Sequence, residues 1–284
     1  MRRRAVTLSN LPALMGLAFA AACSPGTEGA GSGDGTLEGR ITITGSSTVA
    51  PLMGEVARRF EAEHPGVRVD VQTGGTSRGI ADVRRRVAQI GMISRGLRPE
   101  EEDLDAVAVA LDGITLIVHR DNHVATLSHD QVVDIFTGRV RRWDTVGGRE
   151  AEITVVSKAD GRATLELFLD HFGLRRDEIH PSLVIGDNQH GIRSVAGDPA
   201  AIAYVSIGTA AFESSQGRAI RMLPLDGVEP TLAAVQSGEF PASRPLNLVT
   251  FGDRSPPVQA FLSFAASERV QDLVEAQYFV PAPR

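Results

Sequence analysis

Strand-like and helix-like segments alternate along most of this chain, and this alternation is the feature that most constrains its fold. Residues 40–44 alternate β-branched and polar side chains, which is typical of a strand. Apolar residues then recur as Leu52, Val56 and Phe60, a spacing that places them on one face of a helix. Residues 67–71 resume the strand pattern. Strands and helices in this order predict parallel α/β layers.

The alternation continues towards the C-terminus. A second helix is predicted with Ile80, Val83 and Val87 on its apolar face. Ser128 and Gln131 form the capping-box pattern that begins another helix. Further strands are predicted at 90–93, 114–118, 153–156, 183–185, 202–205 and 245–249, and further helices around 165–172, 189–196 and 258–265.

Length and composition exclude several classes of protein. A chain of 284 residues is long enough for two domains of about 100–150 residues each. A net charge of -6 argues against broad nucleic-acid binding, because a polyanionic partner calls for a clustered basic surface. Only 5% of the residues are aromatic, which leaves little surface for stacking bases or sugars. We therefore expect a small polar ligand and no nucleic acid.

The first residues predict an export signal. Arg2, Arg3 and Arg4 precede a short apolar run at 11–22, and this run ends in small residues directly before Cys23. The pattern resembles the lipobox of bacterial lipoproteins, so we expect residues 1–23 to be a signal peptide with Cys23 as the lipidated residue. Residues 24–36 are rich in Gly, Ser and Thr and predict a flexible tether.

Three loops between a predicted strand and a predicted helix are rich in glycine and hydroxyl groups. Residues 45–48, 74–77 and 160–164 each follow the carboxyl end of a strand. Ligands of open α/β sheets bind at these ends, where helix N-termini offer unpaired N–H groups and a partial positive charge. Taken singly, each serine or threonine is most simply a helix cap. Together the three loops favour a site for an oxyanion.

Catalysis and cofactor binding are not predicted. Asp134 and His171 fit helix faces without a catalytic partner. These loops carry neither a Walker A motif nor a dinucleotide-binding glycine pattern. We therefore expect a binding protein without a cofactor or metal ion.

Several motifs resemble the periplasmic phosphate-binding proteins of phosphate ABC transporters. They are Gly-Ser-Ser-Thr-Val-Ala-Pro at 45–51, Gly-Gly-Thr-Ser-Arg-Gly-Ile at 74–80, Ile-Gly-Met-Ile-Ser-Arg at 90–95, Asp-Ile-Phe-Thr-Gly at 134–138 with Trp143, Ala-Ile-Ala-Tyr-Val at 201–205, and the segment at 245–264. The resemblance covers nearly the whole mature chain. It implies the type II periplasmic-binding-protein fold, in which two α/β lobes, each a mostly parallel sheet flanked by helices, enclose the ligand.

The resemblance also implies lobe boundaries. Lobe one is expected to comprise residues 37–118 and 223–284, and lobe two residues 119–222. The two hinge crossings are expected near 118–120 and 221–225.

The ligand-binding residues implied by the resemblance come from four segments. They are Ser47, Thr48, Ser77, Arg95, Lys158, Arg162 and Thr164. The third loop departs from the family, which commonly has Arg, two residues and Gly-Ser-Gly-Thr, because Lys158 takes the Arg position and Arg162 and Ala163 replace Ser and Gly. Arg95 stands where some members have an Asp that accepts the proton of hydrogen phosphate, and an arginine cannot accept a hydrogen bond.

The resulting expectation is an extracytoplasmic, lipid-anchored, monomeric binding protein that delivers phosphate to the permease subunits of an ABC importer. It would lie in the periplasm or at the cell surface. Two alternatives stay open at this point: a binding protein for another oxyanion such as sulfate or molybdate, and a sensor or adhesin lipoprotein on the same fold.

Overall fold

The computed structural model describes residues 37–283. The predicted signal peptide at 1–23, the lipidation site Cys23 and the predicted tether at 24–36 lie outside the described residues. Within residues 37–283, no helix is both long enough and apolar enough to cross a membrane.

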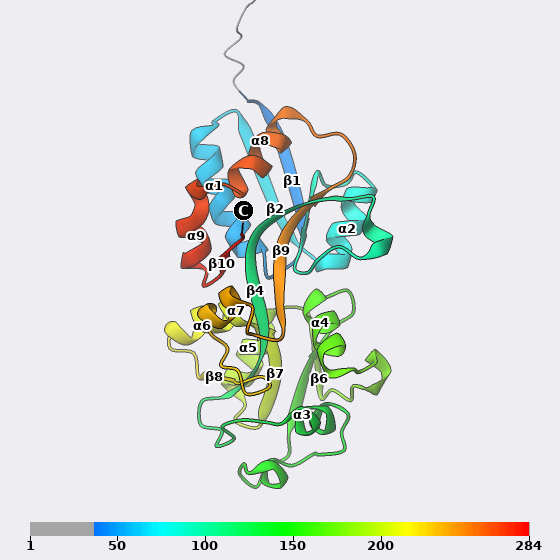
Figure 1. The fold of residues 1–284 in the computed structure, drawn as a ribbon, viewed down its shortest axis with the longest axis vertical. Helices are drawn as coiled ribbons and strands as arrows, with labels where there is room; N and C mark the ends of the chain where they lie inside the picture. The colour runs from blue at the N-terminus through cyan, green and yellow to red at the C-terminus, as the bar shows by residue number, and fades with distance from the viewer. Residues whose placement is uncertain (1–36, 284) are drawn as a thin grey trace, which may run out of the picture. The chain divides into compact units, whose positions relative to one another are not determined.

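The strands follow one path in the order β2-β1-β3-β9-β4-β7-β5-β6, and β8 and β10 each pair with β4 (Figure 1). Their bounds are β1 (Gly39–Gly45), β2 (Val67–Thr73), β3 (Ile90–Ile93), β4 (Asp105–His119), β5 (Thr154–Lys158), β6 (Leu183–Ile185), β7 (Ala201–Ser206), β8 (Ile220–Leu223), β9 (Ser243–Thr250) and β10 (Val280–Pro281).

Helices connect most of these strands. They are α1 (Ala50–Glu63), α2 (Thr76–Arg84), α3 (His129–Phe136), α4 (Ala163–Phe172), α5 (Asn188–Gly197), α6 (Ile207–Ser215), α7 (Leu232–Ser237), α8 (Pro256–Ala265) and α9 (Gln271–Ala276), together with the short 3₁₀ turns η1 (Pro99–Glu101), η2 (Trp143–Val146), η3 (Arg176–Glu178) and η4 (Glu268–Val270).

The α/β class is confirmed, but the prediction of mostly parallel sheets holds only for part of the strand order. β1 is parallel to β2 and β3, and β5 is parallel to β6 and β7. Every pair formed by β4 or β9 is antiparallel. β4 pairs with β9 over residues 105–113 and with β7 and β8 over 114–119, so this one long strand belongs to both halves of the strand path.

Local sequence signals located most element boundaries. The predicted capping box is confirmed at α3, where Ser128 accepts a hydrogen bond from the N–H of Gln131 and the Gln131 side chain accepts one in return. The prediction that Val87 lies on a buried helix face is wrong, because α2 ends at Arg84 and Val87 is 60% exposed. Residues 105–113 of β4 form a strand that was not among the predicted ones, although residues 106–111 are uninterrupted apolar residues.

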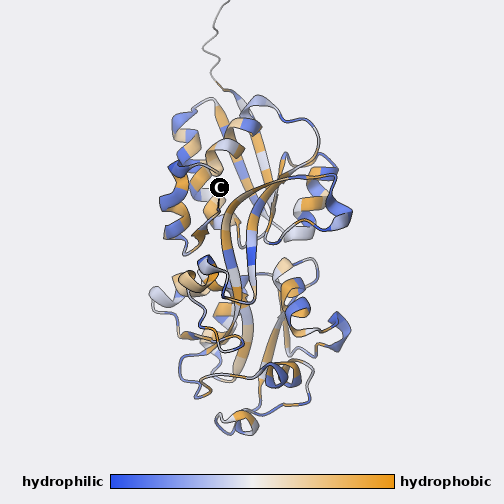
Figure 2. Ribbon diagram, viewed as in Figure 1, coloured by the Kyte–Doolittle hydropathy of each residue, from blue (hydrophilic) through white to orange (hydrophobic). Residues whose placement is uncertain are grey.

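Buried apolar side chains form separate clusters on the two halves of the strand path, and the apolar residues lie along the strands and the inner helix faces (Figure 2). One cluster joins β1, α1 and α8 and includes Ile43, Phe60 and Phe261. The largest joins α3, α4 and β7 and also contains Val235 and Phe240 from the segment before β9. These clusters hold the strand ends and helix starts of each half in fixed positions.

Candidate functional site

Four helix starts converge on a small cavity. The loops before α1, α2, α4 and α5 all contribute to it. The volume open to the centre of a water-sized sphere is about 10 Å³, which is room for a water molecule or a compact ion. Its lining residues are Ser46, Ser47, Thr48, Gly75, Thr76, Ser94, Lys158, Arg162, Ala163, Thr164, Gly186, Asp187 and Asn188.

The hydroxyl groups of the first loop already accept hydrogen bonds from the protein. Ser46 Oγ accepts one from the N–H of Thr48 at 3.2 Å, and Thr48 Oγ1 accepts one from Asn188 Nδ2 at 3.0 Å. Ser46 and Thr48 are buried. Because an oxygen lone pair of each hydroxyl is engaged, its hydrogen is left to donate to a group in the cavity.

Two further hydroxyls show the same arrangement. Thr76 Oγ1 accepts a hydrogen bond from the N–H of Ser94 at 3.2 Å. Thr164 Oγ1 accepts one from Arg244 Nη1 at 2.9 Å. Within residues 37–283, neither hydroxyl donates a hydrogen bond. The polar lining is therefore arranged to donate, which suits an anion.

The start of α4 adds backbone donors. The N–H groups of Ala163 and Thr164 have no hydrogen-bond partner within the described residues, as expected for the first turn of a helix. Gly75 has a φ of 97°, and a Cβ there would come within 2.8 Å of the Gly161 carbonyl oxygen. Only glycine therefore lets the loop before α2 lie this close to the loop before α4.

Lys158 carries the main charge of the cavity. It ends β5, its side chain is 2% exposed, and its Nζ has no hydrogen-bond partner within residues 37–283. Burial lowers the pKa of Lys158 to about 7; Asp187 opposes this shift, whereas Arg244 and Arg162 add to it. A buried ammonium without a partner is costly, so this position favours an anion that approaches the ammonium.

Lys158 is also the only lysine in the sequence, in which Lys and Arg together number 29. Its backbone N–H donates to Tyr204 Oη at 3.1 Å, and the Tyr204 ring stacks on Phe168 with centroids 4.0 Å apart. These contacts fix the end of β5 and hence the origin of the lysine side chain.

Arg162 and Asp187 complete the charged lining. Arg162 forms no ion pair or side-chain hydrogen bond with the described residues, and its guanidinium lies 3.6 Å from the position that a Cβ on Gly186 would take. Asp187 is the only carboxylate among the described lining residues, and its Oδ1 caps α5 by accepting from the N–H of His190 at 2.7 Å. The second oxygen of Asp187 is left as an acceptor.

The structure places five of the seven predicted site residues around this cavity: Ser47, Thr48, Lys158, Arg162 and Thr164. Ser77 is exposed, and its N–H donates to the Gly161 carbonyl at 3.3 Å. The Arg95 guanidinium binds Glu101 at 2.6 Å and Glu166 at 2.8 Å, and its neighbour Ser94 lines the cavity instead. The ligand contacts of all seven residues stay predictions.

Sequence reasoning missed Asp187, Asn188 and Arg244. The first two follow β6 and precede α5, which is the same strand, glycine, polar residue and helix order as in the other loops, so the pattern could have shown them. Arg244 is buried in β9 and pairs with Asp112 at 2.9 Å. No local pattern predicts a pair separated by 132 residues.

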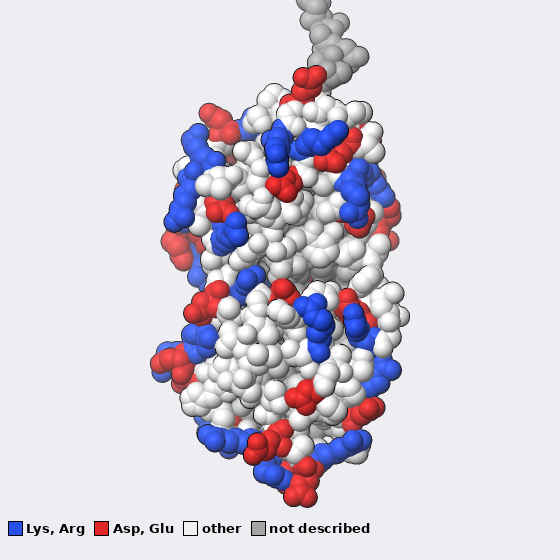
Figure 3. Space-filling model, turned by 180° about the vertical axis from the view of Figure 1, so that it is seen from behind, with Lys and Arg blue, Asp and Glu red and all other residues white. Residues whose placement is uncertain are grey.

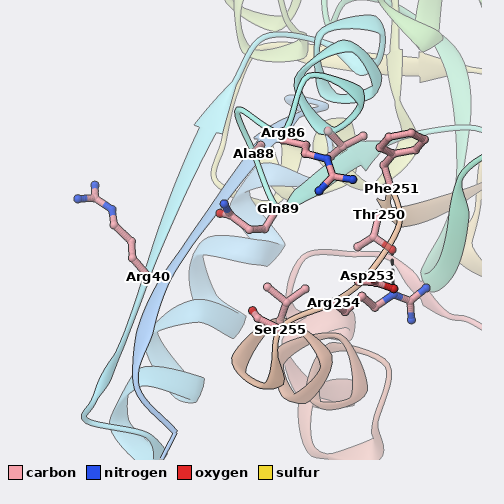
Figure 4. A pocket seen from close by; sticks show the side chains of 11 residues that line it. Arg40, Arg86, Ala88, Gln89, Thr250, Phe251, Asp253, Arg254 and Ser255 are labelled. Carbon is pink, nitrogen blue, oxygen red and sulfur yellow. Dashed lines mark hydrogen bonds between the residues drawn. The ribbon is translucent and has the colours of Figure 1, made fainter.

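A larger cavity lies elsewhere, between α2, β9 and the start of α8 (Figure 4). Its basic side chains already have partners. Arg254 pairs with Asp105 at 2.9 Å, Arg40 contacts Asp70 at 3.5 Å, and Arg86 lies 6.0 Å from the centre of the Phe251 ring. It therefore lacks the unpartnered buried charge that marks the first cavity.

Acidic and basic side chains are interspersed over the face of the molecule shown in Figure 3. This face presents no continuous basic surface of the kind that nucleic-acid binding requires.

Comparison with known proteins gives consistent matches. A family model described as a PBP superfamily domain matches residues 27–269. The phosphate-binding protein PstS of Bacillus subtilis is 30% identical over 257 residues, which cover 88% of this chain and 83% of the relative.

Two solved structures support the same assignment. A putative phosphate ABC transporter substrate-binding protein from Clostridium perfringens, solved with bound phosphate, has a TM-score of 0.80 and 31% identity and covers 86% of this chain and 100% of its own. An ABC-type phosphate transport receptor from Vibrio cholerae has a TM-score of 0.71 and 27% identity and covers 85% and 100%. The predicted family and the expectation of a binding protein rather than an enzyme are confirmed: the chain belongs to the PBP superfamily and, within it, to the family of PstS phosphate-binding proteins.

Proposed function

We propose that this protein captures inorganic phosphate in the cavity around Lys158 and delivers it to an ABC importer. The observation that carries the proposal is the buried, unpartnered ammonium of Lys158 among hydroxyl groups whose hydrogens are free to donate. A small tetrahedral oxyanion supplies the missing acceptors. The similarity to the phosphate-binding protein of Bacillus subtilis, and to the Clostridium perfringens protein solved with bound phosphate, supports phosphate as that anion.

The proposed ligand contacts come from the starts of α1, α2 and α4, from the end of β5 and from the residue after β3. Ser47, Thr48, Arg162 and Thr164 join Lys158, with Ser46, Thr76 and Ser94 added on geometric grounds. Each hydrogen bond to the charged ligand contributes about 1.5–3 kcal/mol, which exceeds the contribution of about 0.3–1 kcal/mol from each helix dipole. Hydrogen bonds should therefore dominate the affinity.

We also propose that the two halves of the strand path are lobes that close over phosphate. The proposed crossings are 113–114 and 242–243, because β4 changes partners at Ile114 and the N–H of Ile114 donates to the Ala242 carbonyl at 3.0 Å. Lobe one is then 37–113 and 243–283, and lobe two is 114–242. The second lobe boundary is placed at 242–243 instead of the expected 222–223, because the segment that contains Val235 and Phe240 packs with α3 and α4.

Glu166 offers a test of closure. It lies on α4 in proposed lobe two and pairs with Arg95 at 2.8 Å and Arg98 at 2.9 Å from proposed lobe one. Glu166→Ala should therefore destabilise the closed form and weaken phosphate binding about 3- to 30-fold, mainly through faster dissociation.

Stopped-flow measurement of phosphate release checks this prediction. Glu100→Ala is the matched control. Glu100 is exposed and its carboxylate lies 4.0 Å from Arg98, which belongs to the same proposed lobe. An unchanged dissociation rate in Glu166→Ala would rule out a role for this pair in closure.

We expect Asp187 to make the cavity prefer phosphate over sulfate. Its carboxylate can only accept hydrogen bonds, so it binds a ligand oxygen only if that oxygen carries a proton. Hydrogen phosphate carries a proton at neutral pH, and sulfate carries none. Asp187→Asn should lower the preference for phosphate over sulfate about 5- to 150-fold, which corresponds to about 1–3 kcal/mol for a buried group left unsatisfied.

Competition calorimetry with both anions measures that preference. Asp198→Asn is a suitable control, since Asp198 caps the opposite end of α5 and does not line the cavity. If the preference is unchanged in Asp187→Asn, this carboxylate does not select the ligand.

The experiment that tests the proposed function is a calorimetric titration of the full-length protein with phosphate, sulfate and molybdate. Saturable binding of phosphate in preference to the other two anions supports it. Binding of sulfate or molybdate instead would transfer the protein to another oxyanion, and no binding of any of them would contradict the transport role.

Export and lipid anchoring are part of the proposal and rest on the sequence alone. Cys23 would become the lipidated first residue of the mature chain, with residues 24–36 as a tether that leaves the binding body free to reach the permease subunits. Mass spectrometry of membrane-extracted protein should show acyl groups on Cys23, and Cys23→Ser should abolish them.

A further inference from the structure

Two histidines and an aspartate meet at a point away from the anion cavity. His129 is the first residue of α3, His171 lies in the last turn of α4, and Asp226 follows β8. One ligand atom from each lies within 4.8 Å of the other two. None of the three lines the cavity around Lys158.

The closest pair in this cluster has the spacing of metal ligands. His171 Nε2 lies 3.1 Å from Asp226 Oδ2. Ligand atoms on a tetrahedral zinc ion, with bonds of about 2.0–2.1 Å, are about 3.3–3.4 Å apart. The ligand atoms lie within 4.8 Å of one another, so the exposed His129 side chain has to approach by at most about 1.5 Å to complete three ligands with this spacing.

His171 Nε2 is otherwise unexplained. The atom is buried and forms no hydrogen bond by geometric criteria within residues 37–283, so the Asp226 carboxylate at 3.1 Å is its charged contact there. A buried ring nitrogen that forms no hydrogen bond is unfavourable in a folded protein. A cation between the ring nitrogen and the carboxylate would satisfy both groups.

The surrounding structure holds the three side chains in place. Asp226 has a φ of 50° and Gly227 a φ of 80°, and Leu225 and Val228 exchange two hydrogen bonds across this tight turn. The Phe172 ring lies 4.8 Å from the His171 ring and 5.0 Å from the His129 ring, which forms an apolar wall beside the cluster.

We propose that His129, His171 and Asp226 form a site for a divalent transition metal ion, with zinc as the best match. Two imidazoles and one carboxylate are typical zinc ligands, and three protein ligands leave a fourth position for water. The ion would tie the start of α3 and the end of α4 to the turn after β8. The site is independent of phosphate binding.

The test is a calorimetric titration of metal-free full-length protein with ZnCl₂ in a buffer without phosphate. We expect one saturable ion per chain. His129→Gln and Asp226→Asn, both at exposed positions and therefore compatible with folding, should each weaken binding at least about tenfold. His123→Gln is the matched control, because His123 is exposed and its side chain hydrogen-bonds to Arg149.

Cobalt gives a second readout that reports coordination directly. Co²⁺ added to the wild-type protein should produce the visible absorption of a four- or five-coordinate nitrogen and oxygen site, and His171→Ala should abolish it. No saturable zinc binding, or binding with equal affinity in the wild type, His129→Gln and Asp226→Asn, would overturn the proposal.

Discussion

Replacing Lys158 with methionine is expected to weaken phosphate binding by about 30-fold to several thousand-fold. The loss corresponds to about 2–5 kcal/mol, the usual cost of truncating one partner of a buried charge pair. Methionine keeps most of the side-chain volume but removes the only ammonium that faces the cavity. Calorimetric titration with phosphate measures the loss, and affinity within threefold of the wild type would place the ligand elsewhere.

The same substitution should increase the stability of the ligand-free protein at low pH. Folding lowers the pKa of Lys158 from 10.5 to about 7, so the folded state binds this proton less tightly than the unfolded state. The cost is fully present below about pH 7 and disappears as the pH rises through 10.5. Lys158→Met should therefore raise the melting temperature at pH 6 and leave it nearly unchanged near pH 10.5.

Because Lys158 is the only lysine, its titration can be observed directly. Protein labelled with ¹³C-lysine should show one side-chain signal that titrates near pH 7 without ligand. Saturating phosphate should move this titration upward, since an anion stabilises the ammonium. A signal that titrates near 10.5 with and without phosphate would contradict both the burial and the contact.

Replacing Arg244 with methionine is expected to lower the free energy of unfolding by about 3–5 kcal/mol, because it leaves the Asp112 carboxylate buried and unpaired. Both side chains are almost fully buried, with Asp112 also accepting hydrogen bonds from Ser206 Oγ and the Gly208 N–H. Urea unfolding of the full-length protein measures the change.

A double variant provides the control for this pair. Arg244→Met combined with Asp112→Asn removes the stranded charge while keeping an acceptor for Ser206 and Gly208, and should recover part of the lost stability. Arg244→Met should also weaken phosphate binding, since Thr164 loses the donor that orients its hydroxyl. If the double variant is as unstable as the sum of both single variants, the pair is not coupled.

The fold could be predicted from the sequence where its determinants are local. Apolar spacing located α1 and α4, and the Ser128 capping box located α3, because these signals act within a few residues. The antiparallel role of β4 was not predictable, since this one strand pairs with four others that lie far along the chain. Tertiary pairing, not local propensity, decides such a strand.

The candidate site, too, could be predicted only where its determinants are local. Glycine and hydroxyl residues before α1, α2 and α4 could be identified, as could Lys158 at the end of β5. The pairing of Arg95 with Glu101 and Glu166 could not, because the sequence does not show which acidic side chains surround a given arginine. The role of Asn188 as a donor to Thr48 likewise depends on the fold that brings residues 140 positions apart into contact.

The most direct test of the central claim is a crystal structure of the protein with arsenate, a tetrahedral analogue of phosphate whose position is given by its anomalous scattering. We expect one strong peak in the cavity between α1, α2, α4 and α5, within hydrogen-bond distance of Lys158 Nζ and the Thr48 and Thr164 hydroxyls. A peak at another site, such as the larger cavity near Arg86 and Arg254, together with an unoccupied Lys158 cavity, would contradict it.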